Sequence, residues 1–147
     1  MEWTKDDFII TTDKKKVDIA YVHWFLSRSY WAEGIPADTV ERSIAGSLCF
    51  SIVYLNHQVG FARVITDQAT FAYLADVFID ENFRGRGLGK WLVETILQHP
   101  GLQGLRRFML ATKNAHGLYT QFGFEPLNNA ERWMQIHNPD VYKKSEE

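Results

Sequence analysis

The stretch that decides the fold is Asn82–Leu97, with the sequence NFRGRGLGKWLVETIL. Three glycines alternate with arginine and leucine, and apolar residues then recur at the three- and four-residue spacing of a helix. A helix N-terminus carries unpaired backbone N–H groups and a partial positive charge, and glycines let several such groups converge on one anion. Arg84 and Arg86 add forked donors suited to phosphate. The stretch predicts a phosphate or pyrophosphate site at the start of a helix.

Two common phosphate-binding patterns do not fit this loop. Lys90 stands where the dinucleotide fingerprint has its third glycine, and Trp91 stands where a P-loop has the serine or threonine that holds magnesium. The pattern that fits is Arg-x-x-Gly-x-Gly, from Arg84 to Gly89. The alternative for this loop is a tight connection whose arginines are merely solvated.

The whole chain is suited to one domain, residues 1–147. Apolar residues make up 46% of its 147 residues, enough for a core without disulfides, and its formal net charge is −2. That charge argues against broad binding of nucleic acid or anionic membranes. Cys49 is the single cysteine and the N-terminus lacks a signal-peptide profile, so we expect a cytoplasmic protein. The histidines show no metal-ligand spacing, so no metal site is expected.

The hydrophobic pattern changes period along the chain. Short turns join the middle strands, which indicates an antiparallel meander, and the later strand–helix–strand order gives an α/β fold with a mixed, mostly antiparallel central sheet flanked by helices. Strands are expected at 8–11, 49–55, 59–65, 69–79, 108–112 and 133–137, and helices at 17–31, from Pro36 onward, from 88 to about 99, and at 115–122.

Two motifs together resemble one family. The Arg84–Gly89 loop resembles the pyrophosphate loop of the GCN5-related N-acetyltransferases (GNAT), which hold acetyl-CoA. The stretch ATKNAHGLYTQFGF at 111–124 is similar to the Tyr-x-x-x-Gly-Phe ending of that family, and its AHGLY segment resembles one bacterial subgroup. The resemblance extends over roughly residues 45–126.

The resemblance implies a GNAT-like fold and an acetyl-CoA-dependent N-acetyltransferase. Such an enzyme would transfer an acetyl group directly to a primary amine of an unidentified acceptor, either a small molecule or a peptide. The residues that would contact acetyl-CoA (coenzyme A) are Val77, Phe78, Ile79, Arg84, Gly85, Arg86, Gly87, Leu88, Gly89, Lys90, Asn114 and Tyr119.

The resemblance also implies catalytic roles. Tyr119 would protonate the departing thiolate, since a phenol can donate to a developing thiolate; otherwise it is a core aromatic. Asp76 would act as the base through water, or else is a structural carboxylate. Glu33 is a second candidate for the base, or else a solvated loop charge.

The end of the first helix would line the acceptor pocket through Arg28, Tyr30 and Trp31, although ordinary packing would also explain these aromatics. Strand alternation places Asp76 and Phe78 on one face of the sheet and Val77 and Ile79 on the other. Two alternatives to an enzyme stay open: a non-catalytic acyl-CoA-binding or sensing module, and a protein that binds another nucleotide. The protein is expected to be a monomer or a homodimer.

Overall fold

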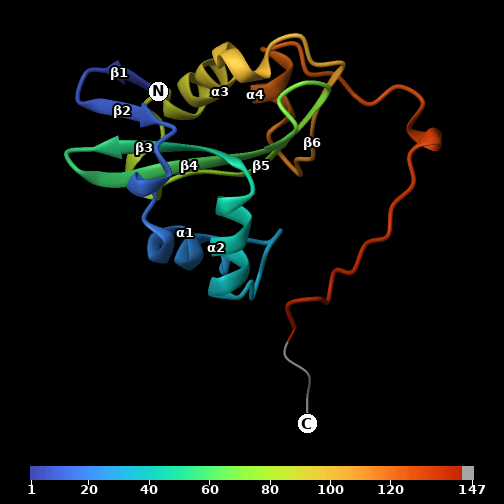
Figure 1. Ribbon diagram of the computed structural model, residues 1–147, viewed down its shortest axis with the longest axis horizontal. Helices are drawn as coiled ribbons and strands as arrows, with labels where there is room; N and C mark the ends of the chain where they lie inside the picture. The colour runs from blue at the N-terminus through green and yellow to red at the C-terminus, as the bar shows by residue number, and fades with distance from the viewer. Residues whose placement is uncertain (144–147) are drawn as a thin grey trace.

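The computed structural model describes residues 1–143 and contains one domain built on a six-stranded sheet (Figure 1). The strands lie in chain order from β1 to β6; the first five pair antiparallel with their neighbours, and β6 pairs parallel with β5. This confirms the expected mixed, mostly antiparallel sheet. The strands are β1 (Glu2–Lys5), β2 (Phe8–Thr11), β3 (Leu48–Tyr54), β4 (His57–Thr66), β5 (Phe71–Ile79) and β6 (Arg107–Leu110).

Helices cover both faces of the sheet. Figure 1 shows α1 and α2 below it, and α3 and α4 above it. Their bounds are Ile19–Leu26 for α1, Ala37–Ala45 for α2, Leu88–Gln98 for α3 and His116–Thr120 for α4. Asp18 caps α1 by accepting a hydrogen bond from the Tyr21 N–H, and α3 ends just before Pro100, as the sequence predicts.

Each face of the sheet has its own hydrophobic core. Leu92, Val93 and Ile96 of α3 are almost completely buried against one face. Val22 of α1 and Val40 of α2 are fully buried against the other. Burying such a side chain contributes about 1.5–3 kcal/mol, so the alternation of apolar residues along β3 to β5 fixes which face each helix covers.

The sheet opens in the middle of β5. The register between β4 and β5 shifts between the Phe61 and Arg63 pairs, and Asp76 at this bulge has a left-handed backbone with φ of 55°. The parallel pairing with β6 ends at Leu74. Residues 75–79 therefore have one edge with no strand beside it in the described part of the chain.

The structure shortens two expected helices and adds one strand. The first helix ends at Leu26 rather than residue 31, because the Ser29 hydroxyl donates to the Leu26 carbonyl and accepts from the Ala32 N–H, which turns the chain. β1 was not expected from the sequence. The last helix is also shorter than expected, at five residues.

The predicted strand at Trp133–His137 is wrong. These residues form no strand, and Met134 and Ile136 are fully solvent-exposed. A strand needs a neighbour to pair with its backbone groups, and within residues 1–143 no other segment lies in register with this one.

Candidate active site

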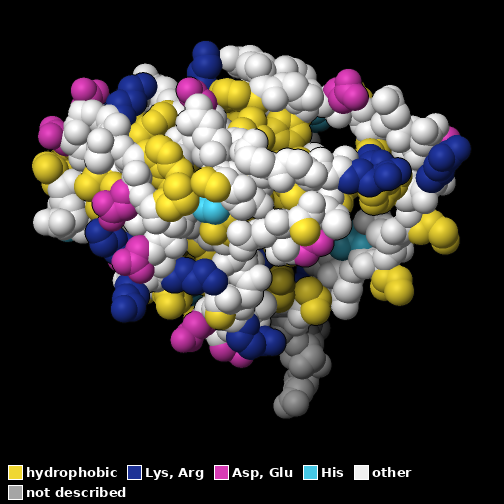
Figure 2. Space-filling model, turned by 45° about the horizontal axis from the view of Figure 1, so that its top comes forward, with side chains coloured by type: hydrophobic (Ala, Val, Ile, Leu, Met, Phe, Trp, Pro, Cys, Tyr) yellow, Lys and Arg dark blue, Asp and Glu magenta, His cyan; other side chains and the backbone are white. Residues whose placement is uncertain are grey.

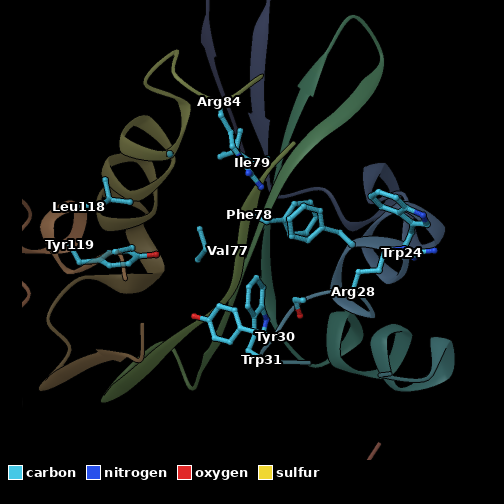
Figure 3. Close-up of a pocket in the computed structure, with 14 residues that line it drawn as sticks. Trp24, Arg28, Tyr30, Trp31, Val77, Phe78, Ile79, Arg84, Leu118 and Tyr119 are labelled. Atoms are coloured by element: carbon cyan, nitrogen blue, oxygen red, sulfur yellow. Dashed lines mark hydrogen bonds between the residues drawn. The ribbon is translucent and has the colours of Figure 1, made fainter. Parts of the chain in front are cut away.

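A cavity of about 740 Å³ lies where the sheet opens, between the chain that follows α1 and the helices α3 and α4 (Figure 3). Three separate parts of the chain contribute to it: the end of α1 with the following loop, the second half of β5 with the glycine loop, and α4. The residues that line it are Trp24, Phe25, Arg28, Ser29, Tyr30, Trp31, Val77, Phe78, Ile79, Arg84, Gly89, Ala115, Leu118 and Tyr119.

The floor of the cavity is the open half of β5. Val77, Phe78 and Ile79 all line it. Phe78 packs in the core beneath α1 and α2, with its ring stacked on that of Phe25 at 3.9 Å between centroids, whereas Val77 and Ile79 pack on the α3 side. The alternation expected for β5 is therefore present, and an unpaired strand edge faces the cavity with its backbone donors and acceptors.

The glycine loop joins this strand to α3. Gly85 and Gly87 have φ values of 79° and 77°, which a residue with a Cβ adopts only with strain, and Gly87 directly precedes the first turn of α3. Arg84 lines the cavity, and its Nε donates to the Ile79 carbonyl at 3.2 Å. This bond holds a cationic fork beside a helix N-terminus, an arrangement suited to a phosphate group.

The other predicted cofactor residues lie at different depths. Gly89 lines the cavity, whereas the Leu88 side chain is buried in the core and leaves only its backbone near the loop surface. The Arg86 guanidinium lies 5.1 Å from the Phe83 ring centroid, and Lys90 is exposed on the first turn of α3. Asn114 is exposed and is not among the lining residues.

Tyr119 lies across the cavity from β5. Its ring points from α4 toward Val77 in Figure 3, and the residue is only 7% exposed. Burial raises the pKa of its phenol, and the nearby Tyr30 raises this pKa further. The phenol is therefore protonated at neutral pH and has a proton to donate.

The two candidate bases have different surroundings. The Asp76 carboxylate accepts a hydrogen bond from Arg63 Nε at 2.8 Å and another from Trp31 Nε1 at 2.9 Å, so both of its oxygens have partners. Glu33 is exposed on the loop after α1 and is not among the lining residues. Neither carboxylate is among the lining residues, but Asp76 contacts the cavity wall through its hydrogen bond to Trp31.

The far wall is aromatic and cationic. Arg28, Tyr30 and Trp31 all line the cavity. The Arg28 guanidinium lies 4.6 Å from the Trp24 ring centroid, and Lys113 Nζ lies 5.4 Å from that of Tyr30. This wall carries no carboxylate among its lining residues.

Comparison with known proteins identifies the family. The sequence profile of the acetyltransferase (GNAT) family matches residues 14–124, which is most of the chain. The chain belongs to the GNAT family of acetyltransferases. This membership favours an enzyme over the non-catalytic sensing module and makes acetyl-CoA the acetyl donor.

GNAT relatives match at several levels of similarity. A candidate GNAT acetyltransferase from Xanthomonas campestris pv. campestris has a crystal structure with a TM-score of 0.91 and 46% identity, covering 93% of this chain and 97% of that one. A candidate acetyltransferase from Gibberella zeae is 31% identical over 140 residues, which covers 80% of this chain and 78% of the relative. A GNAT acetyltransferase from Elizabethkingia anophelis, crystallised with acetyl-CoA bound, shares the fold with a TM-score of 0.64 at 16% identity, over 84% of this chain and 80% of that one.

Several cavity residues of this GNAT domain were not expected from the sequence: Trp24, Phe25, Ser29, Ala115 and Leu118. The four-residue spacing of Trp24 and Arg28 on one helix face is a signal that would have found the first of them. The pairing of Arg63 with Asp76 could not be predicted in this way, because the two residues are 13 positions apart and lie on different strands.

Within residues 1–143, no three His, Cys, Asp or Glu side chains come together as a metal site would require. No helix in that range is long and apolar enough to cross a membrane.

Proposed function

We propose that this acetyltransferase transfers an acetyl group directly from acetyl-CoA to a primary amine, with Tyr119 as the acid. The observation that carries the proposal is the position of Tyr119, whose buried phenol faces the open half of β5 across the cavity. In this arrangement a thioester lying along β5 has its sulfur near a protonated donor.

The glycine loop binds the pyrophosphate of the donor. Arg84 supplies the charge-assisted hydrogen bonds, and the backbone of Gly85–Gly89 supplies N–H donors at the N-terminus of α3. Two observations support this proposal. Gly85 and Gly87 have positive φ values, and the Arg84 side chain donates a hydrogen bond to the Ile79 carbonyl at the end of β5. Arg86 and Lys90 add positive charge at the mouth of this site.

The open edge of β5 orients the thioester. Backbone groups of Val77–Ile79 hydrogen-bond the pantetheine arm, and one N–H from Phe78 or Ile79 donates to the carbonyl oxygen as negative charge develops there. The amine nitrogen attacks the carbonyl carbon, a C–N bond forms, and the C–S bond breaks. Tyr119 gives its proton to the leaving thiolate, while the amine loses a proton to water or to a carboxylate.

Asp76 acts by positioning rather than as a free base. Its carboxylate is already paired with Arg63 and accepts from Trp31, so it fixes the indole that lines the acceptor side. Glu33 stays a candidate base only if the loop after α1 brings it closer when acceptor binds.

The acceptor is a small molecule or a peptide. An amine with a flat or apolar body suits the walls formed by Trp24, Tyr30 and Trp31. A polycation suits them less, because Arg28 and Lys113 stand beside the aromatic rings and the Asp76 carboxylate is already neutralised. We also propose a cytoplasmic location, on the single reduced cysteine, and a kinship of the 115–119 segment with the bacterial AHGLY subgroup.

The test is release of coenzyme A from acetyl-CoA over a panel of primary amines, with aromatic amines, amino acids, amino-sugars and polyamines as separate groups. We expect release with at least one group, and its loss in the Tyr119→Phe variant. An acceptor that is acetylated equally fast by wild type and by Tyr119→Phe contradicts the role of Tyr119. Release without any amine-dependent increase contradicts direct transfer.

A further inference from the structure

The cavity has a positive charge that the pyrophosphate does not use. Among its lining residues within the range 1–143, only Arg28 and Arg84 are charged. Arg84 lies beside the glycine loop, where a pyrophosphate uses its charge. Figure 3 shows Arg28 and Trp24 on the side of the cavity opposite Tyr119. The acceptor side of the cavity therefore has a cation of its own.

The Arg28 guanidinium is held in one orientation by the end of α1. Its Nη1 donates to the Trp24 carbonyl at 2.9 Å, and the group lies 4.6 Å from the Trp24 ring centroid. In the described part of the chain it makes no other hydrogen bond and no ion pair. The nitrogens left over, Nε and Nη2, form the edge of the guanidinium that binds a carboxylate through two parallel hydrogen bonds. The side chain is thus a fixed donor pair without an acceptor.

The surroundings of Arg28 supply no negative charge to match it. No carboxylate is among the lining residues, and Asp76 beside the cavity is paired with Arg63 at 2.8 Å. A second cation, Lys113, has its Nζ 5.4 Å from the Tyr30 ring centroid and forms no ion pair with the described residues. Electrostatic complementarity therefore favours an acceptor that carries a negative charge.

This positive charge is local to the cavity. The whole chain has a formal net charge of −2, and Figure 2 shows basic and acidic side chains mixed over the face that it displays. A mixed surface of this kind does not attract anions in general. An anionic group is therefore selected by contact inside the cavity and not by the field of the whole surface.

The acceptor side of the cavity also offers exposed aromatic rings. Trp24, Tyr30 and Trp31 line the cavity, yet they are 53%, 60% and 42% exposed. Large apolar side chains exposed together mark a binding surface, and flat rings suit a flat or apolar ligand. Figure 3 shows Val77 between these rings and Tyr119. An amine that reacts beside Val77 therefore has its anionic group at the other end of the molecule.

We propose that the acceptor is a small amine with a carboxylate at the end away from the amine, joined to it by a flat or apolar body, and that Arg28 binds this carboxylate. The inference rests on the proposed function, because it names the class of acceptor for the same transfer. It makes Arg28 a residue that determines specificity, and it does not depend on the role of Tyr119.

The first experiment compares three acceptors of one shape: para-(aminomethyl)benzoate, para-(aminomethyl)benzamide and para-(aminomethyl)benzylamine. The group opposite the reacting amine is anionic, neutral or cationic, and release of coenzyme A gives kcat/KM for each. We expect the benzoate to exceed the benzamide by about tenfold or more, since a hydrogen-bonded charge contributes about 1.4 kcal/mol or more. We expect the benzylamine to be the poorest acceptor. Equal values for the benzoate and the benzamide overturn the proposal.

Variants assign this preference to one side chain. The ratio of the two kcat/KM values, benzoate over benzamide, should fall to about one in Arg28→Gln, and Arg28→Glu should favour the benzylamine over the benzoate. Each ratio is taken within one variant, so a partial loss of folded protein cancels. Arg42→Gln is the matched control, because Arg42 is an exposed arginine of α2 and its loss should leave the ratio unchanged. A wild-type ratio in Arg28→Gln overturns the role of Arg28.

A second experiment detects the carboxylate site without any transfer. The protein, saturated with coenzyme A, is titrated in a calorimeter with para-(acetamidomethyl)benzoate and with the corresponding benzamide, the acetylated products of two of the acceptors. We expect the benzoate to bind about tenfold more tightly, and the difference to vanish in Arg28→Gln. Equal binding, or none by either compound, overturns the carboxylate site even where transfer is intact. A clear preference in binding with no amine-dependent release supports the site and contradicts direct transfer instead.

Discussion

Asp76 and Arg63 form an ion pair of 2.8 Å that bridges the bulge between β4 and β5. The two side chains are 9% and 16% exposed, so water screens the pair little. The Asp76 carboxylate also accepts from Trp31, which lines the acceptor side of the cavity. The pair thus links the opening of the sheet to the wall against which an acceptor would bind.

Replacing Asp76 by Asn should destabilise the protein by about 2–3 kcal/mol, because Arg63 would keep a poorly compensated charge in a nearly buried position. Asn also tolerates the left-handed backbone at this position, so the change tests charge rather than strain. The measurement is the free energy of unfolding in urea.

The double variant Asp76→Asn, Arg63→Gln separates positioning from base catalysis. Removing both charges should recover part of the lost stability, and turnover should recover with it if Asp76 only holds Trp31 in place. Turnover that stays low while stability recovers would instead make Asp76 the base.

Arg84→Glu should weaken acetyl-CoA binding by about tenfold to a hundredfold, because it puts a negative charge where a pyrophosphate is bound. Calorimetric titration with acetyl-CoA measures this. Arg42→Glu is the control, because this substitution changes the charge by the same amount at an exposed position of α2, away from the cavity. Equal affinities for the two variants would remove the loop from the cofactor site.

Tyr119→Phe should lower kcat by about a hundredfold and leave the affinity for acetyl-CoA nearly unchanged, since only the proton donor is lost. Tyr54→Phe, on β3, is the control for the loss of a hydroxyl. A variant with wild-type kcat would show that water supplies the proton.

The same residue predicts a pH dependence. The active form of an acid is the protonated one, and burial raises the pKa of Tyr119 above its usual value of 10.0. The wild-type rate should therefore show no decline attributable to this phenol below pH 10, and should fall above it. A fall centred below pH 9 that is absent from Tyr119→Phe would contradict the assignment.

Cys49 should be unreactive in the folded protein. Burial raises the pKa of its thiol from 9.0 to about 11, so the thiolate is scarce at pH 8. Ellman's reagent at pH 8 should react slowly with the native protein and rapidly after denaturation, and Cys49→Ala should give no signal in either state. Rapid reaction of the native protein would mean that the β3 face opens readily.

The same shift has a consequence for stability. The pKa of the Cys49 thiol is higher in the folded protein than in the unfolded protein. The contribution of this shift to the free energy of unfolding is therefore complete below pH 9 and is lost as the pH rises toward 11. The wild type should lose more stability than Cys49→Ala over that interval. Equal losses in the two proteins would show that the thiol does not ionise differently on folding.

The sequence predicted those elements whose limits are set by residues close together in the chain. The helix after the glycine loop was expected from residue 88 to about 99 and spans Leu88–Gln98, because its apolar period, its glycine entry and Pro100 all lie within one short stretch. Three parts of the chain that the family motifs singled out also line one cavity in the structure: Arg84, Val77–Ile79 and Tyr119. The meander of β3 to β5 followed from its short turns.

Features that depend on distant partners were not visible in the sequence. The bulge at Asp76 depends on the register of β5 against β4, and the pairing with Arg63 spans 13 residues. The Trp133–His137 segment has the composition of a strand, but composition cannot supply the neighbour that a strand needs. Asp76, Glu33 and Asn114 were expected from the family's layout, yet none of the three is among the lining residues of the cavity.

Tyr119 borders two hollows at once, the one where the thioester lies and the one beside β6. A five-residue helix has too little internal hydrogen bonding to hold such a ring by itself, so its orientation depends on what is packed behind it. The ring of Phe124 packs edge-on against that of Tyr119 within the same chain, so the residues after the Gly123 turn help to hold the proton donor in place. A substitution in the hollow beside β6 would therefore change the rate of acetyl transfer through this one ring, although the substituted residue touches no part of the acetyl-CoA site.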